Sequence, residues 1–114
     1  MIPAAFRFHG HNSLRYVYTN GKAIRSHLAT VKYVGNPRRS KSRIAVVVSK
    51  KVLKSAVGRN RIRRRIYEYM RVQLPLMNGV HDIVVIITSQ DALTFDGPEL
   101  KQQLDQIMAQ TNLF

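Results

Sequence analysis

Cysteine is absent from this chain of 114 residues, and so are long apolar runs. Without thiols the protein forms neither a disulfide framework nor a zinc site with thiolate ligands, which favours a reducing, cytoplasmic setting. The longest aliphatic runs, near Val46 and Val84, are far too short to span a bilayer, and the N-terminus lacks the apolar segment of a signal peptide. We therefore expect a cytoplasmic protein with no membrane partner.

Acidic residues are scarce in the first two thirds of the chain. From Met1 to Arg71 there are 18 lysines and arginines against one acid, whereas Val72 to Phe114 carry one lysine against five acids. The net charge is +13, and arginines outnumber lysines by 12 to 7, which suits bidentate contacts to phosphate. This charge pattern favours nucleic acid as the partner, ahead of an acidic membrane surface.

Clustered carboxylates, which a metal-dependent protein nuclease needs, are also missing. The basic region offers only Glu68, the other five acids are dispersed, and the four histidines lie in unrelated segments. No glycine-rich phosphate loop, nucleophile elbow or metalloprotease motif appears. The sequence predicts no catalytic residue and no metal site, so the protein is expected to bind, with any catalysis supplied by a partner.

The densest positive charge lies between Arg59 and Arg65, where five of seven residues are arginine. Like charges three or four residues apart cost about 0.2 to 0.5 kcal/mol each in an isolated helix, so a polyanionic partner best explains this density. Ser55 or Asn60 can cap the helix, Pro75 ends it, and its N-terminal amides attract phosphate. The helical period turns one set of residues inward (Ile62, Ile66, Tyr69, Met70) and another outward (Arg61, Arg64, Arg65, Glu68).

The rest of the pattern predicts one α/β domain over residues 1–114. The predicted elements are a helix from Asn12 or Ser13 to Asn20, a strand over 23–34, an antiparallel strand over 43–48, a strand over 81–89 and a last helix. Residues 44–48 of the second strand are apolar on both faces, which indicates a central strand. Asp96 and Glu99 have capping-box spacing at the start of the last helix, whose apolar stripe should pack on the sheet (Leu100, Leu104, Ile107, Met108).

Tyrosines in the first predicted helix have two interpretations. Leu14, Val17 and Tyr18 share one face, so this stripe can pack on the core. Alternatively, Tyr16 or Tyr18 offers a ring on which a nucleotide base can stack. The residues alone do not decide between these two interpretations for Tyr18.

The arginine-rich stretch resembles that of the bacterial ribonuclease P protein subunits. Their pattern A-x-x-R-N-x-hydrophobic-basic-R is matched from Ala56 to Arg64, and the preceding V-S-K-K is matched from Val48 to Lys51. The similarity extends from Arg7 to the last helix. Two positions depart from the family pattern, because Tyr67 stands where a basic residue is usual and Leu14 stands where an aromatic residue is usual.

This resemblance implies a fold and a division of labour. The fold is an α/β (α+β) two-layer sandwich, with about four strands in a mixed sheet packed with helices. Its βαβ unit crosses over with the left hand, although general rules favour the right hand. A catalytic RNA cleaves the 5′ leader from precursor tRNA with Mg²⁺ that is bound mainly by RNA, and the protein, a monomer in the complex, assists without performing chemistry.

Site residues follow by position from the same resemblance. One surface meets the catalytic RNA (Arg59, Asn60, Arg61, Arg63, Arg64, Arg65, Lys50, Lys51). A separate cleft between the first helix and the open sheet face holds the single-stranded leader of precursor tRNA (Tyr18, Lys32, Val46). The alternative function is a ribosomal or general RNA-binding protein without a processing role.

Overall fold

The fold is organised around one four-stranded sheet with the strand order β1-β2-β4-β3. The computed structural model describes residues 11–36 and 41–114, with side chains from residue 15 onward. Expectations for Arg7, the Leu14 side chain and the turn at Pro37 lie outside this description. The elements are α1 (His11–Asn20), β1 (Lys22–Arg25), β2 (Ala29–Gly35), β3 (Arg43–Val47), α2 (Ala56–Gln73), the 3₁₀ helix η2 (Leu74–Leu76), β4 (His81–Ile87), α3 (Asp91–Thr94) and α4 (Gly97–Ala109).

The stretch predicted as one strand over 23–34 forms two strands, β1 and β2, joined by a tight turn. The strands pair antiparallel, with Ile24 opposite Val31. Ser26 shapes the turn, because its backbone N–H and its hydroxyl both donate to the carbonyl of Ala29, at 3.0 and 2.8 Å. The prediction of a single strand was wrong because it overlooked this serine, a residue whose side chain readily bonds nearby backbone.

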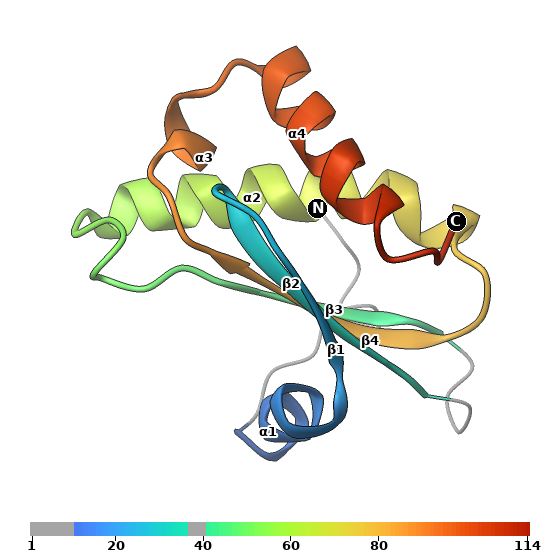
Figure 1. Cartoon of the computed structure of the whole chain (residues 1–114). Coiled ribbons are helices and arrows are strands. Elements are labelled where there is room, and N and C mark those ends of the chain that lie inside the picture. The colour runs from blue at the N-terminus through green and yellow to red at the C-terminus, as the bar shows by residue number, and fades with distance from the viewer. Residues whose placement is uncertain (1–10, 37–40) are drawn as a thin grey trace.

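Strand β3 lies at an edge of the sheet, which corrects its predicted central position. It runs parallel to β4, and β4 separates it from β2, so β2 and β3 are antiparallel in direction without pairing. Ile44, Ala45 and Val46 are nevertheless all buried, because helices cover both faces of the sheet (Figure 1). An apolar pattern on both faces reports coverage of the faces and not the position in the strand order.

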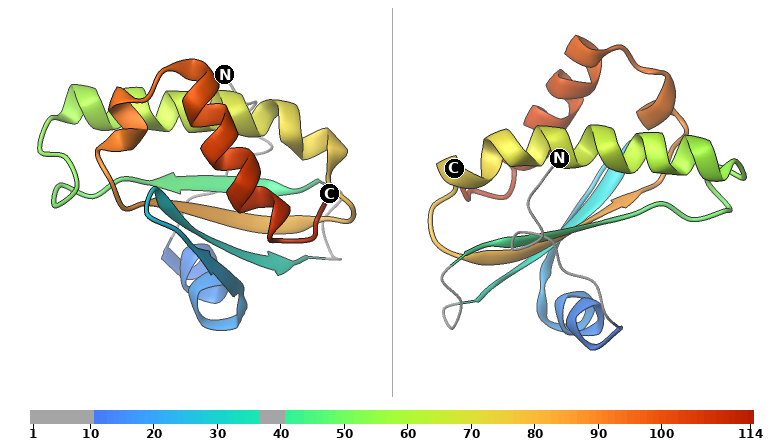
Figure 2. Two further views of the ribbon diagram at one scale, coloured as in Figure 1. Left: turned by 45° about the horizontal axis from the view of Figure 1, so that its top comes forward. Right: turned by 180° about the vertical axis from the view of Figure 1, so that it is seen from behind.

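The helices lie unequally on the two faces of the sheet. Figure 1 shows α2, α3 and α4 above the sheet and α1 below it. In the left view of Figure 2, which looks from the α2 side, β3 and β4 both run to the left. The chain leaves β3, passes through α2 on the near side of the sheet and returns to β4, which lies below β3 in this view. This is a left-handed crossover, so the mixed sheet and its unusual hand are both confirmed.

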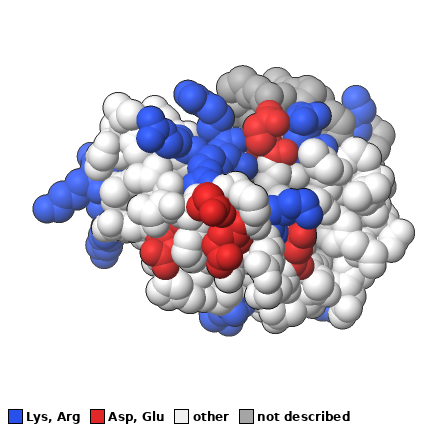
Figure 3. Space-filling model, turned by 90° about the horizontal axis from the view of Figure 1, so that it is seen from above, with Lys and Arg blue, Asp and Glu red and all other residues white. Residues whose placement is uncertain are grey.

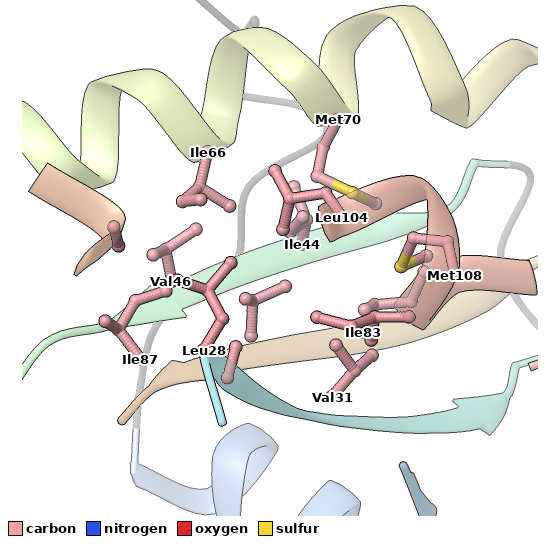
Figure 4. Packing of buried hydrophobic residues seen from close by; sticks show 14 of the residues in the cluster. Leu28, Val31, Ile44, Val46, Ile66, Met70, Ile83, Ile87, Leu104 and Met108 are labelled. Carbon is pink, nitrogen blue, oxygen red and sulfur yellow. The ribbon is translucent and has the colours of Figure 1, made fainter. Parts of the chain in front are cut away.

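The main core fills the space between the sheet and the helices α2 and α4 (Figure 4). Every second side chain of the strands points into this layer, including Val31, Ile44 and Ile83, because successive strand residues face opposite sides of the sheet. The predicted stripes of both helices are buried against them, with Tyr69 only partly so (Ile62, Ile66, Met70, Leu100, Leu104, Ile107, Met108).

A second, smaller apolar cluster attaches α1 to the opposite face of the sheet. It centres on Val17, Ala45 and Val84, which are at most 6% exposed. Gly21, which follows α1, allows the close approach, because a Cβ there would lie 2.5 Å from the carbonyl oxygen of Val17 and 2.9 Å from that of Tyr33. The length of α1 and its distance from the sheet are therefore limited by backbone contact.

An ion pair links the beginnings of the parallel strands β3 and β4. Arg43 donates to both carboxylate oxygens of Asp82, at 3.0 and 2.8 Å, and the Asn36 amide donates to the same carboxylate at 2.9 Å. The side chains of Arg43 and Asp82 are 14% and 5% exposed. The positive charge of Arg43 is therefore compensated within the protein.

Candidate nucleic-acid interface

The start of α2 is built by a serine cap and a tightly packed glycine. Of the two predicted caps the structure uses Ser55, whose hydroxyl accepts the backbone N–H of Gly58 at 3.1 Å. Gly58 lies against Leu53, since a Cβ at Gly58 would meet the Leu53 side chain at 2.6 Å. The connection from β3 is thereby held close to the first turn of α2, with Lys50 and Lys51 exposed beside it.

Arg59 belongs to the framework of this connection. Its guanidinium donates to the backbone carbonyls of Leu53 and Lys54, at 3.0 and 2.7 Å. Because these carbonyls precede the helix, Arg59 ties the incoming loop to α2. Its Nη1 group is therefore engaged inside the protein, which the sequence pattern did not reveal.

Arg65 points toward α3 and away from the exposed face of α2, which corrects its predicted outward position. Its guanidinium donates to the carbonyls of Ala92 and Leu93, at 3.0 and 2.9 Å, and to that of Phe95. These are carbonyls of the short helix α3 and its end, where a cation is favoured. No helix or strand was predicted between residue 89 and the last helix, so the partner of Arg65 was missed.

Three basic residues of the stretch remain available on the outside of α2. Arg61 and Arg64 are exposed, and within residues 11–36 and 41–114 neither has a hydrogen-bond or ion-pair partner. Arg63 is partly exposed and donates to the side chain of Asn60 one turn earlier. In Figure 3, lysines and arginines gather over α2 and beyond its N-terminal end, while most of the carboxylates in view lie on the side of α3 and α4.

Tyr67, which departs from the family pattern, lies on the side of α2 that faces the β3 edge. Its hydroxyl accepts the backbone N–H of Val46 at 3.4 Å, a long hydrogen bond. Strand edges leave backbone donors unpaired, and Tyr67 satisfies one of them. A basic side chain has no acceptor to offer this N–H. At this position the tyrosine therefore replaces a positive charge with a hydrogen-bond acceptor for the edge strand.

Tyr18 and Lys32 meet on the α1 face of the sheet. The Lys32 ammonium lies 5.1 Å from the centre of the Tyr18 ring, within the range of a cation–π contact. Tyr18 is 40% exposed, and its partial burial raises the pKa of the phenol. Two predicted leader-binding residues are therefore adjacent, with an accessible ring, while Tyr16 next to them is 55% exposed.

Val46 does not share this surface, and its predicted place there is corrected. It is 7% exposed and packs in the main core on the α2 side of the sheet. Successive strand residues point to opposite faces, so its neighbours Ala45 and Val47 are the β3 residues on the α1 side. The strand was identified correctly. Which of its alternating side chains face α1 depends on the location of that helix, which the sequence does not give.

A groove of about 480 Å³ runs between α2 and α4. Beside it, a hydrogen bond of 2.6 Å from the Tyr69 hydroxyl to Asp105 joins the two helices, and Asp105 also pairs with Lys101 at 2.8 Å. Burial, followed by the bond to Asp105, raises the pKa of Tyr69, and the Lys101 ammonium together with the Tyr69 hydroxyl lowers the pKa of Asp105. The groove was missed from the sequence, although its apolar residues recur at helical spacing.

The carboxylates of the chain are all engaged in local interactions. Five of them contact Arg71, Arg43, His27, Gln103 and the Tyr69–Lys101 pair, and Asp96 accepts the N–H of Glu99 at 2.9 Å as the predicted cap of α4. Within the described part of the chain, no three side chains of His, Asp or Glu come together as metal ligands. The described helices also include none long and apolar enough to cross a membrane.

Comparison with known proteins identifies the family. The family model described as Ribonuclease P matches residues 2–112. The ribonuclease P protein component of Pseudanabaena sp. is 30% identical to this chain, covering 99% of it and 97% of the relative. That of Symbiobacterium thermophilum is 29% identical, covering 96% of this chain and 93% of the relative.

Solved structures agree in fold. The RNase P protein of Staphylococcus aureus superimposes with a TM-score of 0.84 at 25% identity, covering 96% of this chain and 97% of that one. The RNase P protein of Thermotoga maritima gives a TM-score of 0.75 at 22% identity, covering 89% and 94%. With the arginine-rich start of α2 and nearly the whole length matched, the chain belongs to the ribonuclease P protein family, as a protein subunit that binds RNA and acts in 5′ maturation of tRNA.

Proposed function

We propose that this protein contributes binding and electrostatics to ribonuclease P, while the partner RNA performs the cleavage. The observation that carries this proposal is the engagement of all six carboxylates in caps, ion pairs and hydrogen bonds. A protein nuclease would need several of them to converge on metal ions or water. Mg²⁺ would therefore be held mainly by RNA phosphates, since the described residues do not provide a fitting ligand set.

The surface around the start of α2 is the proposed contact with the catalytic RNA. We assign to it the residues whose polar groups lie outside, together with the two lysines that precede the helix (Lys50, Lys51, Asn60, Arg61, Arg63, Arg64). The helix N-terminus adds partial positive charge in the same place. Arg59 and Arg65 support this surface from within, because their guanidinium groups hold backbone carbonyls.

The α1 face of the sheet is the proposed contact with the 5′ leader of precursor tRNA. Single-stranded RNA binds where an aromatic ring for stacking lies beside positive charge. Tyr18 and Lys32 supply both at 5.1 Å, and they lie on the face of the sheet opposite α2. One protein can therefore contact both RNAs at once. We infer that it acts as a monomer in the complex, and that the complex processes precursor tRNA in the cytoplasm.

Reconstitution tests this division of labour. At low Mg²⁺ the catalytic RNA of the same organism should cleave precursor tRNA faster with the protein than without it, because protein cations offset repulsion between the two RNAs. The purified protein alone should give no cleavage. Absence of stimulation at every Mg²⁺ concentration would contradict the proposal, and cleavage by the protein alone would move the chemistry to the protein.

A further inference from the structure

The groove between α2 and α4 has an apolar floor and a charged rim. The floor is formed by aliphatic side chains from both helices, Tyr69 forms one wall, and Val72 remains 53% exposed within the floor (Val72, Leu100, Leu104). Rim residues are Arg64, Glu68 and Lys101. An apolar surface left open between two packed helices, beside charge, is typical of a binding site for a ligand with one flat apolar part.

The aromatic wall of the groove is held in a fixed orientation. Tyr69 packs against the main core through its ring and donates its hydroxyl to Asp105 at 2.6 Å. Lys101 holds the other oxygen of Asp105 at 2.8 Å. A ring fixed at both ends loses little conformational entropy when a second flat group stacks against it, so the wall is preorganised for binding.

Charge and position relate the groove to the RNA-facing surface. Arg64 belongs to that surface and also lines the groove, and within the described part of the chain its guanidinium is unpaired. The rim also carries Glu68, whose carboxylate accepts from Arg71 at 3.2 Å. A phosphate bound by Arg64 would therefore place the attached nucleotide at the mouth of the groove, with limited repulsion from Glu68.

We propose that an unpaired nucleotide of the catalytic RNA inserts its base into the α2–α4 groove and stacks on Tyr69, with its phosphate held by Arg64. This inference rests on the proposed contact between α2 and the catalytic RNA and extends it to the side of the helix that faces α4. The apolar floor contacts the base, and the rim supplies the counterion. RNA recognition of this kind uses bases that are free of pairing.

Site-specific photo-crosslinking tests the position of the RNA. The chain has no cysteine, so Val72→Cys can be labelled uniquely with a photoreactive azide and mixed, as the full chain, with the catalytic RNA. Gln106→Cys, on the exposed side of α4, is the matched control. We expect a crosslink to RNA from position 72 and little from position 106. Equal RNA yields at both positions, or a protein–protein crosslink that assigns the groove to a second copy, would overturn the proposal.

Salt-dependent binding separates this proposal from the contact with the catalytic RNA in general. Val72→Gln should weaken binding of the catalytic RNA about fivefold or more at every salt concentration, because it removes apolar contact with the base without changing charge. Leu76→Gln replaces another exposed apolar residue outside the groove and should change binding less than twofold. If Val72→Gln binds like Leu76→Gln while Arg64→Ala still lowers affinity, the groove is empty of RNA although α2 binds it.

Discussion

The arginine side chains of the stretch from Arg59 to Arg65 have different tasks, although the sequence presents them as one cluster. Arg59 and Arg65 donate to backbone carbonyls of neighbouring segments. Arg61 and Arg64 project into solvent. The density of like charge is thus partly a structural requirement, which reduces the number of arginines available for phosphate.

This division predicts that substitutions of two adjacent arginines affect different properties, RNA binding for one and folding stability for the other. Arg64→Ala should weaken binding of the catalytic RNA and reduce the slope of log affinity against log salt by about one, without changing stability. Arg65→Ala should lower the free energy of unfolding by about 1 to 3 kcal/mol, because three carbonyls of α3 lose a charged donor. Binding across a salt series and urea unfolding measure the two quantities.

Arg61→Ala is a second test of the same surface, since the side chains of Arg61 and Arg64 are both exposed on α2. Arg61→Ala should lower the salt slope of RNA binding by a similar amount. Unchanged salt slopes for both variants would mean that these side chains face solvent in the complex. If Arg65→Ala left the free energy of unfolding unchanged but lowered the salt slope of RNA binding, Arg65 would be assigned to the RNA-binding surface.

Tyr67 gives a second prediction for a single residue. Tyr67→Phe keeps the ring but removes the oxygen that accepts the Val46 N–H, so the free energy of unfolding should fall by about 0.5 to 1 kcal/mol, the low end for a long hydrogen bond. Tyr16→Phe, at an exposed position, should change nothing. Equal stabilities of the two variants in urea would show that Tyr67 does not cap the strand edge.

Single residues were predicted best where the local pattern alone decides their environment. Ile62, Ile66 and Met70 are buried as their spacing requires, and Asp96 caps α4. Arg65 and Val46 were misplaced because their environments depend on segments distant in sequence, α3 for the arginine and α1 for the valine. Helical period gives the face of a helix, but the identity of the neighbouring element requires the fold.

At the scale of elements, α2 and α4 are joined by the Tyr69–Asp105 hydrogen bond, which should depend on pH. Because the pKa of Asp105 is lowered in the folded protein, its contribution is present above the pKa of the unfolded carboxyl, about 3.9, and is lost as pH falls through the lower folded value. The Asp105 side chain is 41% exposed, so the contribution at neutral pH is only about 0.5 kcal/mol.

Unfolding of Asp105→Asn measures this dependence. The variant should be slightly less stable than the natural protein at pH 6 and equal to it well below pH 3.9, the approximate pKa of an unfolded aspartate. Lys101→Gln keeps the hydrogen bond between Tyr69 and Asp105. Its loss of stability relative to the natural protein at pH 6 should therefore be smaller than that of Asp105→Asn. A stability difference that persists unchanged into strong acid would mean that Asp105 acts through packing rather than charge.

Elements were mostly identified from sequence, whereas their arrangement was not. The helices α2 and α4 have strong periodic stripes, so their existence was predictable. The edge position of β3 and its parallel pairing with β4 depend on a crossover whose left hand contradicts the general rule, and only the resemblance indicated it. Strand order is a long-range property that periodicity does not encode.

At the scale of the whole molecule, the sheet separates the two proposed RNA-binding surfaces. The start of α2 lies on one face, and Tyr18 with Lys32 lies on the other. The acids gathered on α3 and α4 keep a third side less positive (Figure 3). The distribution of the net charge of +13 therefore agrees with the proposal that one chain contacts two RNA molecules.

The separation of surfaces predicts that they can be disabled independently. Tyr18→Ala should weaken binding of precursor tRNA by about 1 to 3 kcal/mol if one base stacks on the ring, and leave affinity for the catalytic RNA unchanged. Tyr16→Ala is the neighbouring control. Comparing precursor and mature tRNA in the assembled complex measures the effect, and an equal loss for mature tRNA would exclude a leader contact at Tyr18.

The buried pair of Arg43 and Asp82 also determines how the parallel strands align. These residues are direct partners in the pairing of β3 with β4. A slip of β3 by one residue would turn Arg43 to the opposite face and leave a buried carboxylate without its cation, a cost of several kcal/mol. The same slip would exchange Ala45 and Val46 between the two faces. One ion pair thus selects the alignment that turns Ala45 to the α1 face and Ile44 and Val46 to the main core.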